Sequence, residues 1–415
     1  MIKNTSTKNV FNIIVIVAAL GYFVDIYDLI LFSILRVSSL DIKHGLGLND
    51  DELKNVGLSL LSWQMTGMLI GGLLWGIIGD LKGRVSVLFG SIILYSAANI
   101  LNGLITDVDQ YKWLRLLAGI GLAGELGAGI TLVSETMTKE RRGFGTTLVV
   151  SFGVSGAILA AWVGNNFEWR TAYFIGGGLG LVLLFLRIGV YESGMYKTIK
   201  RKGVQAGNFL LLFKKKNTLL KYLSCIGVGL PIWFVVGILI FLSREFAKSF
   251  NVSEPVNQGL SVMYCYIGMA SGDFVCGLLS QIFKTRKKIL VIYLSTTLIC
   301  VLIYLFQKNI SLTFLYFLCF TLGFCAGYWA VFITVASEQF GTNIRSTVTT
   351  TVPNFVRGSV ALMTIGLEFL ENTFQISLIY SALIIGLITL ALAFASLFWM
   401  KETFGKDLDY VEEFV

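Results

Sequence analysis

The first apolar stretch of the chain, residues 9–35, contains two carboxylic acids, Asp25 and Asp28, about one helical turn apart. A charged acid in the middle of a bilayer costs about 2.5–3.5 kcal/mol on insertion scales, so it needs a wet cavity, a partner or a proton. Tyr22, Asp25 and Asp28 recur at helical spacing, which places them on one face of a helix. We therefore predict that this face borders a water-accessible passage. Two neighbouring carboxylates there disfavour joint ionisation, which suits one of them to carry a proton.

Further ionisable residues lie within later apolar stretches. Arg115 lies at a depth similar to that of Asp28, so a salt bridge between them is geometrically allowed. Protonation of Asp28 would then free Arg115 for a substrate carboxylate, and a permanent structural pair is the alternative. Glu125, surrounded by glycines, either carries a proton or hydrogen-bonds a neighbouring helix. Arg357 either contacts a substrate anion or forms a structural ion pair, for example with Asp273.

Aromatic and amide side chains near the expected midplane complete the candidate site. Aromatic rings can pack over a substrate, although rings at helical spacing more often pack against other helices. Arg187, by contrast, lies near the end of its span and can simply snorkel to the membrane surface. The candidate substrate-binding residues are Tyr22, Asp25, Asp28, Gln64, Arg115, Glu125, Trp233, Tyr328, Trp329, Asn354 and Arg357, and the candidate proton-coupling residues are Asp25, Asp28, Arg115 and Glu125.

The composition is that of a polytopic membrane protein. Of 415 residues, 55% are hydrophobic and only 14% are charged, and the mean hydropathy is +0.76. A soluble domain of this size would need far more charge on its surface. The formal charge of +8 is carried by short clusters between apolar runs rather than by one face, which argues against nucleic-acid binding. All six cysteines lie in apolar segments without metal or disulfide spacing, and the sole histidine, His44, joins no catalytic constellation.

Apolar runs of about 20 residues predict twelve transmembrane spans. Their approximate limits are 9–35, 54–79, 85–106, 111–136, 144–165, 170–191, 218–244, 257–282, 288–307, 311–337, 345–370 and 375–399. The polar interruption at 192–217 divides them into two bundles, 1–191 and 218–399, and leaves a tail, 400–415, that we expect to be disordered. Most basic residues outside the spans lie on the side of the N-terminus, so both termini are expected to be cytoplasmic.

The two halves of the chain are related in sequence. A shift of 203 positions places Ala123, Gly124, Ile130, Thr131, Ser134, Glu135 and Arg142 on Ala326, Gly327, Ile333, Thr334, Ser337, Glu338 and Arg345. Glutamate, arginine and serine are scarce in these spans, so apolar composition alone does not explain the identities. The match predicts a duplicated six-helix unit in parallel orientation, and such repeats place a substrate site near the midplane between the halves.

The second span ends in the sequence GLLWGIIGDLKGR at residues 72–84. Small residues allow close helix approach, glycine suits a tight turn, and an acid among basic groups can link the inner ends of neighbouring helices. This segment resembles the signature loop of the major facilitator superfamily. The sequences RLLAGIG at 115–121, WR at 169–170 and EQFGTNIR at 338–345 are similar to further hallmarks of that superfamily, so the resemblance covers nearly the whole fold. A less complete match to this loop follows span eight, with Gln281 at the position of the acid.

The resemblance implies an all-α membrane protein with the major facilitator fold, built from twelve transmembrane helices in two six-helix bundles. It implies alternating access, and it associates the arginine-glycine motif at Arg115 with proton coupling. The residues expected to form the motif and the gate at the inner ends are Gly76, Gly79, Asp80, Lys82, Gly83, Arg84, Glu135, Arg142, Glu338 and Arg345.

A finer resemblance rests on the opening GYFVDIYD at 21–28 and on YESGM at 191–195. Both look like the phagosomal nutrient transporter family of intracellular Gram-negative bacteria, whose members import amino acids or nucleosides. This resemblance implies a multi-pass protein of the bacterial inner membrane.

We predict proton-coupled import of a small polar solute, with an amino acid as first choice, because Arg115 or Arg357 with Asp25 or Glu125 could hold both charges of a zwitterion. A nucleoside held by amide and aromatic contacts, a sugar, a carboxylate or a non-transporting receptor are the alternatives. The expected partners are the solute, a proton and membrane lipid. We expect a monomer without cofactor, metal or nucleic acid, driven by the proton gradient.

Overall fold

The computed structural model describes residues 13–137, 142–187, 209–407 and 410–411. Long helices dominate it because the apolar stretches satisfy their backbone hydrogen bonds internally. The first half contains α1 (Ile13–Leu40), α2 (Asp50–Lys82), α3 (Arg84–Asn102), α4 (Val108–Leu122), α5 (Glu125–Thr136), α6 (Arg142–Val154), α7 (Gly156–Asn166) and α8 (Trp169–Leu186). The second half contains η1 (Phe209–Phe213), α10 (Lys216–Phe234), η2 (Val235–Ile240), α11 (Ser243–Ser249), α12 (Gln258–Ile282), α13 (Lys287–Leu305), α14 (Leu312–Ala326), α15 (Trp329–Gln339), α16 (Arg345–Phe374) and α17 (Leu378–Trp399).

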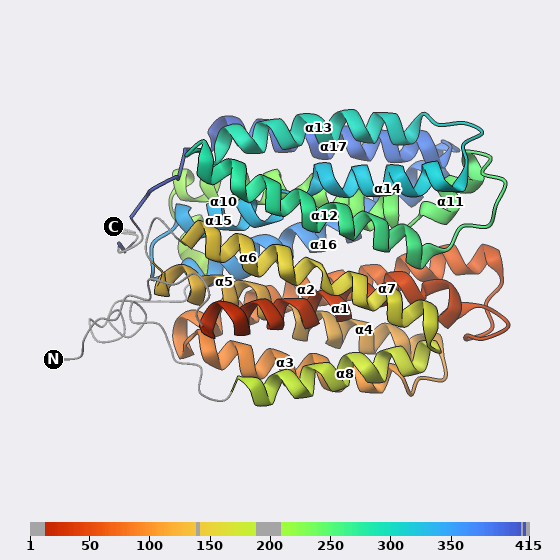
Figure 1. Cartoon of the computed structure of the whole chain (residues 1–415), viewed down its shortest axis with the longest axis horizontal. Helices are drawn as coiled ribbons and strands as arrows, with labels where there is room; N and C mark the ends of the chain where they lie inside the picture. Colours follow the sequence, from red (N-terminus) through yellow and green to blue (C-terminus); the bar gives the residue numbers. More distant parts are fainter. Residues whose placement is uncertain (1–12, 138–141, 188–208, 408–409, 412–415) are drawn as a thin grey trace.

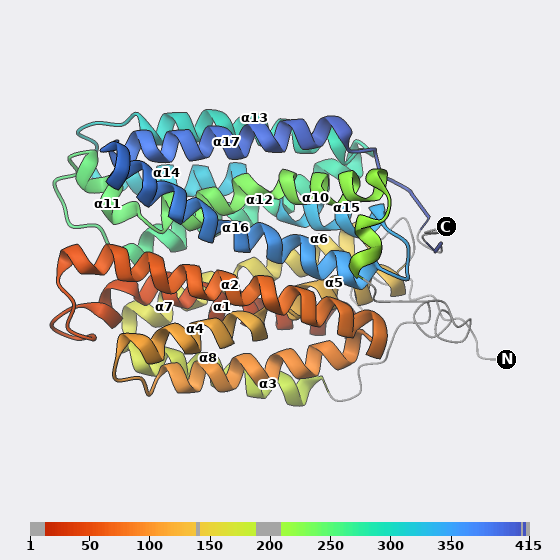
Figure 2. The same ribbon diagram turned by 180° about the vertical axis from the view of Figure 1, so that it is seen from behind.

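The helices form two bundles that lie side by side (Figure 1). Helices α1 to α8 make one bundle and α10 to α17 make the other, and Figure 2 shows the same division from behind. The bundles meet where α2 packs along α16, and where α1, α6 and α7 pack against α12. We call the end of the molecule where α1 begins and α17 ends the inner end, and the opposite one the outer end.

Eleven helical segments of the described residues are long and apolar enough to cross a membrane. The helix α16 is also long, with 30 residues, but threonines, Arg345, Asn354 and Arg357 make it more polar than the others. Because α16 packs between α2, α10 and α17, its polar side chains face protein. It accounts for the remaining span of the predicted twelve, and the predicted all-α fold is confirmed. The predicted loop 192–217 lies outside the described residues up to residue 208.

The internal repeat is visible in the helix breaks and in the contacts. The fourth span is interrupted between Leu122 and Glu125, and the tenth between Ala326 and Trp329. The shift of 203 positions also relates two hydroxyl pairs that join the bundles. Thr131 Oγ1 lies 2.5 Å from Thr349 Oγ1, and Thr334 Oγ1 lies 2.8 Å from Thr146 Oγ1.

The seventh span has a local irregularity that shapes the centre of the molecule. Pro231 stands inside α10, where it supplies no N–H to the helix, and the single π-helical turn η2 follows it. Such turns shift the register of the side chains after them and occur frequently at functional sites. Trp233 lies between the proline and the π-turn.

The prediction of a disordered tail is wrong for the part that the structure describes. Glu402 accepts hydrogen bonds from the backbone N–H groups of Arg286 and Lys287 and from Thr285 Oγ1. Thr403 Oγ1 donates to Glu338 Oε2 at 2.8 Å. The tail therefore packs against the inner end of the second bundle, because its acid meets donors at the start of α13.

Candidate functional site

A small central cavity lies between the two bundles. Its volume is about 10 Å³, which leaves room for about one water molecule. Aromatic and apolar residues from α1, α6, α10, η2, α12 and α15 surround it: Tyr22, Ile26, Val154, Ile232, Trp233, Val236, Tyr266, Met269 and Trp329. Three residues that the sequence predicted for a substrate site, Tyr22, Trp233 and Trp329, are thus brought together.

Arg357 lies directly behind this aromatic lining. Its guanidinium carbon lies 5.7 Å from the ring centre of Trp233 and 5.5 Å from that of Trp329. The hydroxyl of Tyr22 accepts hydrogen bonds from Arg357 Nη2 at 3.3 Å and from Trp329 Nε1 at 2.9 Å. No described carboxylate forms an ion pair with Arg357, so the predicted pairing with Asp273 is wrong. Asp273 instead accepts a hydrogen bond from the backbone N–H of Ala330, in the first turn of α15.

The two acids of α1 do not line the central cavity. Asp25 and Asp28 are fully buried, neither lines that cavity, and their carboxylate oxygens have no hydrogen-bond partner among the described residues. Asp28 packs against Gly176 of α8, where the missing Cβ leaves room for its Oδ1. The prediction that this face borders a water-accessible passage is therefore wrong for the conformation seen here. Of the three residues predicted for this face, Tyr22, Asp25 and Asp28, only Tyr22 lines the cavity.

Arg115 does not pair with Asp28 in the part of the chain that the structure describes. Its Nη1 donates to Tyr173 OH at 2.9 Å, and its guanidinium lies over the rings of Phe32 and Tyr173. Asp28 and Arg115 remain within electrostatic range of each other. Asp25 is likewise within electrostatic range of Arg357 on the opposite bundle. The predicted salt bridge is wrong here, because the aromatic neighbours hold the arginine away from the acid.

Glu125 has a partner that the sequence did not indicate. It forms a buried ion pair with Arg187, whose Nη1 also donates to the backbone oxygen of Leu88 at 3.0 Å. A side chain at position 21 would collide with this pair, so Gly21 lets α1 pass beside it. The prediction that Arg187 snorkels to the surface is wrong, since only 1% of the residue is exposed. For Glu125, the predicted hydrogen bond to a neighbouring helix agrees with the structure in placing a contact between helices, although that contact is an ion pair.

The remaining polar candidates bond to the backbone of neighbouring helices. Gln64 Nε2 donates to the carbonyl of Leu29, and Tyr328 OH donates to the carbonyl of Val228. Asn354 Nδ2 donates to Ala123 O at 2.7 Å and so joins α16 to the break in the fourth span. None of these three lines the central cavity, and all are buried.

Ion pairs between the bundles close the outer end. Arg36, at the end of α1, contacts Glu245 of α11 at 2.9 Å, and Lys54 of α2 contacts Glu371 of α16 at 2.9 Å. Outside the first pair lies a vestibule of about 750 Å³, to which Asp41, Arg244 and Lys248 contribute charge. Sequence reasoning missed these two pairs. Opposite charges stand at the outer ends of spans in different halves, but the sequence does not indicate which of them pair.

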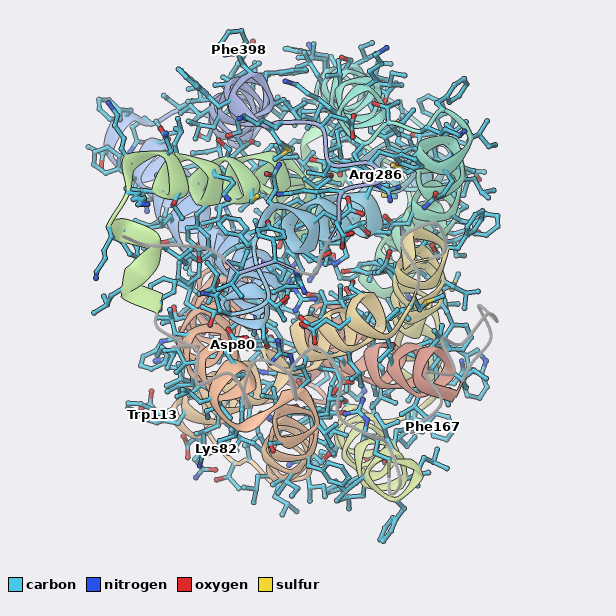
Figure 3. All side chains as sticks on the ribbon, turned by 90° about the vertical axis from the view of Figure 1, so that its left-hand side faces the viewer. Asp80, Lys82, Trp113, Phe167, Arg286 and Phe398 are labelled. Carbon is cyan, nitrogen blue, oxygen red and sulfur yellow. The ribbon has the colours of Figure 1, made fainter. Side chains whose placement is uncertain are left out.

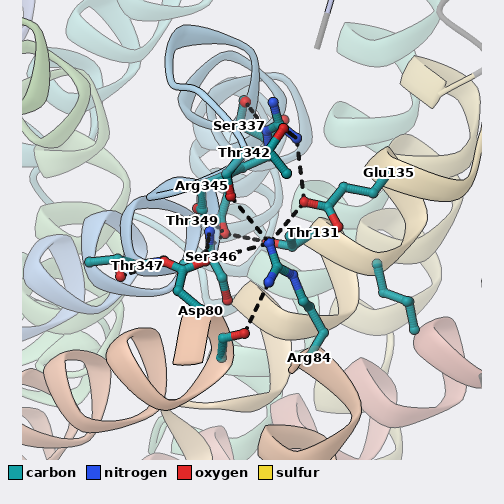
Figure 4. Close-up of polar contacts among 12 residues, drawn as sticks. Asp80, Arg84, Thr131, Glu135, Ser337, Thr342, Arg345, Ser346, Thr347 and Thr349 are labelled. Carbon is teal, nitrogen blue, oxygen red and sulfur yellow. Dashed lines mark hydrogen bonds and ion pairs between the residues drawn. The ribbon is translucent and has the colours of Figure 1, made fainter. Parts of the chain in front are cut away.

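The inner end is closed by Asp80 (Figure 4). One carboxylate oxygen accepts hydrogen bonds from Thr347 N at 2.8 Å and Thr347 Oγ1 at 2.6 Å, and the other accepts one from Ser346 N at 3.2 Å. Asp80 belongs to α2 and the two donors begin α16, so the acid caps a helix of the opposite bundle. A carboxylate at a helix N-terminus satisfies free N–H groups and complements the helix dipole.

Two arginines from different bundles share Glu135 beside this contact. Glu135 Oε1 lies 2.9 Å from Arg84 Nη2 and 3.3 Å from Arg345 Nη1 (Figure 4). Gly79 permits the approach of α2 to α16, because a Cβ there would meet Ser346 Oγ. Gly83 has φ of 103°, a conformation that favours glycine, and it ends the turn into α3. Residues predicted for the inner gate therefore join the two bundles, and their role as a gate stays a prediction.

Other residues predicted for the inner gate have different surroundings. A Cβ at Gly76 would lie 3.1 Å from Thr347 Cα, so this glycine also serves close packing. Lys82 is exposed and points outward (Figure 3). Glu338 pairs with Arg286 at 3.4 Å within the second bundle. Arg142 begins α6, but its side chain lies outside the described residues.

Comparisons with known proteins agree with this architecture. The family model described as Major Facilitator Superfamily matches residues 13–363. A putative metabolite transport protein of Haemophilus influenzae is 28% identical over 94% of this chain and 96% of its own length. A putative niacin/nicotinamide transporter of Bacillus subtilis is 27% identical over 82% of this chain and 84% of its own length.

Among solved structures, the fold is similar to that of a proton:xylose symporter. The TM-score is 0.74, with 16% sequence identity over 97% of this chain and 98% of that one. Neither relative named above is described as a phagosomal nutrient transporter, so that finer resemblance stays a prediction.

Proposed function

We propose that this chain, which belongs to the Major Facilitator Superfamily, is a proton-coupled importer of a small organic carboxylate with an apolar or aromatic body. As a member of the superfamily it is a secondary transporter and not an enzyme. The observation that carries the substrate class is Arg357, a buried guanidinium without a carboxylate partner among the described residues, placed against two indoles that line the central cavity.

The lining favours a carboxylate over the amino acid that the sequence suggested. A zwitterion needs a cation and an anion in one cavity, yet the nine described lining residues include no acid. Flat aromatic walls formed by Trp233, Trp329 and Tyr266 suit an apolar body, and Arg357 behind them suits its carboxylate. The name of the Bacillus subtilis relative includes niacin, an aromatic carboxylate that fits this proposal, and also its amide, nicotinamide.

Proton coupling is assigned to Asp25, with Asp28 behind it. Asp25 is within electrostatic range of Arg357, so an ionised Asp25 competes with a substrate carboxylate for that cation. A proton on Asp25 removes the competitor, and substrate binding then favours the protonated acid in turn. In the occluded conformation both acids are buried without a donor among the described residues, a setting in which an ionised carboxylate is costly.

Alternating access follows from the two gates. Opening the outer end requires separation of Arg36 from Glu245 and of Lys54 from Glu371, and opening the inner end requires release of Asp80 from the start of α16. The contacts of both gates are formed in this conformation. We assign the inner end to the cytoplasm of a bacterial cell with an inner membrane, in keeping with the distribution of basic residues.

The test is binding and uptake by purified protein in proteoliposomes. Niacin and nicotinamide form a matched pair of probes, because the amide has the same ring but no carboxylate. We expect a panel of aromatic monocarboxylates, including niacin, to raise the thermal unfolding midpoint while nicotinamide, amino acids and nucleosides do not. Stabilisation by amino acids alone would restore the choice made from sequence and would contradict the proposed substrate class.

Variants separate the role of Arg357 from that of Asp25. Arg357→Gln is expected to abolish carboxylate binding, and Arg357→Lys to restore part of it. Asp25→Asn is expected to retain binding and exchange of the carboxylate while losing accumulation driven by an imposed pH gradient. The control, Asp109→Asn, removes an exposed acid at the outer end and is expected to change nothing. Gradient-driven accumulation by Asp25→Asn at the rate of the unaltered protein would contradict the coupling role.

A further inference from the structure

A basic pocket lies at the inner end, between the start of α10 and the chain that leaves α17. Its volume is about 450 Å³. Three lysines contribute to its wall: Lys221 of α10, and Lys401 and Lys406 of the tail. The first turn of α10 adds Asn217 and Thr218. Trp399 closes one side. Ammonium groups on several sides of a cavity are suited to bind phosphate oxygens.

An apolar groove continues from this pocket along the surface of the second bundle. The groove lies between α10 and α17 and has a volume of about 260 Å³. Leu220 and Trp399 line both the pocket and the groove, so the two spaces adjoin. Small residues hollow the groove, among them Gly227 of α10 and Ala395 of α17.

The surface beside the basic pocket and the apolar groove faces the lipid. Phe398 is 78% exposed and Trp399 is 61% exposed, and Figure 3 shows Phe398 pointing away from the bundle at its edge. Aromatic residues at the ends of membrane helices lie at the level of the lipid headgroups. The basic pocket is therefore at headgroup depth, and the apolar groove is at the depth of acyl chains.

We propose that this composite space is a binding site for one anionic phospholipid, with its phosphate among the three lysines and an acyl chain in the groove between α10 and α17. Charge complementarity selects the anionic headgroup, and the adjoining apolar groove selects a molecule with a chain over a free phosphate. Neither the transport site nor the two gates use these residues.

The site also touches the inner gate segment. Lys221 Nζ donates to the carbonyl of Gln339 at 3.0 Å and lies 4.3 Å from the ring centre of Phe340. Gln339 Nε2 in turn donates to the carbonyl of Lys401. A phosphate bound there would contact both the end of α15 and the start of the tail.

The experiment is native mass spectrometry of the purified full chain after titration with phosphatidylglycerol or phosphatidylcholine of identical acyl chains. We expect retention of phosphatidylglycerol in preference to phosphatidylcholine. The double variant Lys401→Gln with Lys406→Gln is expected to weaken phosphatidylglycerol binding by about fivefold or more, as removal of cations near an anionic lipid predicts. The matched control, Lys284→Gln with Lys288→Gln, removes two exposed inner-end lysines outside the pocket and is expected to leave binding unchanged.

A variant that fills the groove and a headgroup without acyl chains test the proposal further. Ala395→Trp fills the apolar groove without altering charge and is expected to weaken phosphatidylglycerol binding even if the lysine variant folds poorly. Glycerol phosphate, the headgroup without chains, is expected to give little thermal stabilisation. Stabilisation by glycerol phosphate equal to that by phosphatidylglycerol would replace the lipid site with a simple anion site. Equal loss of lipid in the control variant would show non-specific attraction, and either result would overturn the proposal.

Discussion

The inner ends of α2 and α12 occupy equivalent places in the two halves of the chain, yet different groups surround them. In the first half, Asp80 accepts hydrogen bonds from Ser346 and Thr347 at the start of α16. In the second half, Gln281 packs against Gly143 at the start of α6. The acid that receives the nearby backbone N–H groups of Arg286 and Lys287 is Glu402, which comes from the tail.

The comparison shows which contacts are the same in the two halves and which are different. The two threonine pairs, Thr131 with Thr349 and Thr334 with Thr146, are preserved because both halves pack the same helices together. Among the contacts that the structure describes, Glu135 joins arginines of both bundles, and Glu338 contacts Arg286 of its own bundle and Thr403 of the tail. We expect closure of the inner end to depend on Asp80, whose place Gln281 takes in the second half.

The largest expected effect is that of Glu135→Gln. The change leaves two buried arginines without their shared carboxylate, and removal of one partner from a buried ion pair costs about 3–5 kcal/mol. We expect a large fall in the free energy of unfolding in detergent and loss of transport. Glu338→Gln serves as the comparison and is expected to cost less, since its hydroxyl partner Thr403 can still bond to the amide. Equal losses of unfolding free energy in the two variants would contradict this expectation.

The next effect is that of Asp80→Asn. The amide keeps one acceptor oxygen but loses the charge, and hydrogen bonds to a charged group contribute about 1.5–3 kcal/mol. We expect the initial rate of uptake in proteoliposomes to fall by about tenfold or more, because the closed inner end is populated less. Gln281→Asn should change the rate by less than about twofold. A similar fall in both variants would mean that the acid has no special role.

A smaller effect is expected at Glu402, and it depends on pH. Burial opposes ionisation of Glu402, but hydrogen bonds from Thr285 and from the N–H groups of Arg286, Phe404 and Lys287 lower its pKa to about 2 from an ordinary value of 4.5. A depressed folded-state pKa contributes stability that is present above pH 4.5 and is lost as the pH falls toward 2. The difference in unfolding midpoint between the unaltered protein and Glu402→Gln should thus be largest near pH 7 and shrink below pH 4.5. A constant difference between pH 7 and pH 3 would contradict this assignment.

The smallest effects should be equal in the two halves. Thr131→Val and Thr334→Val each remove one hydroxyl from a buried pair, and each should cost about 1 kcal/mol of unfolding free energy. Denaturant unfolding of the two variants side by side measures the comparison. A difference well above that value would show that the repeated hydroxyl pairs are not equivalent.

Hydropathy and the sequence motifs were sufficient to predict the helices and several of the residues that meet at the inner end. The apolar stretches indicated twelve spans. The match after a shift of 203 positions indicated that Thr131 and Glu135 have counterparts in Thr334 and Glu338. Asp80 and Arg84 were identified because glycines, one acid and two basic residues stand together in the short segment 72–84. The aromatic residues around the cavity, Trp233 and Trp329, followed from their depth in the membrane.

The partners of the buried charges were decided by the tertiary structure alone. Depth along a span follows from sequence, but the rotation of a helix about its axis depends on how its neighbours pack. That rotation left Asp25 and Asp28 out of the cavity lining and placed Arg187 on Glu125, 62 residues distant. It likewise brought Arg36 to Glu245 across the two bundles. An ion pair between distant spans leaves no local pattern in one sequence, because either charge alone is compatible with several partners at the same depth.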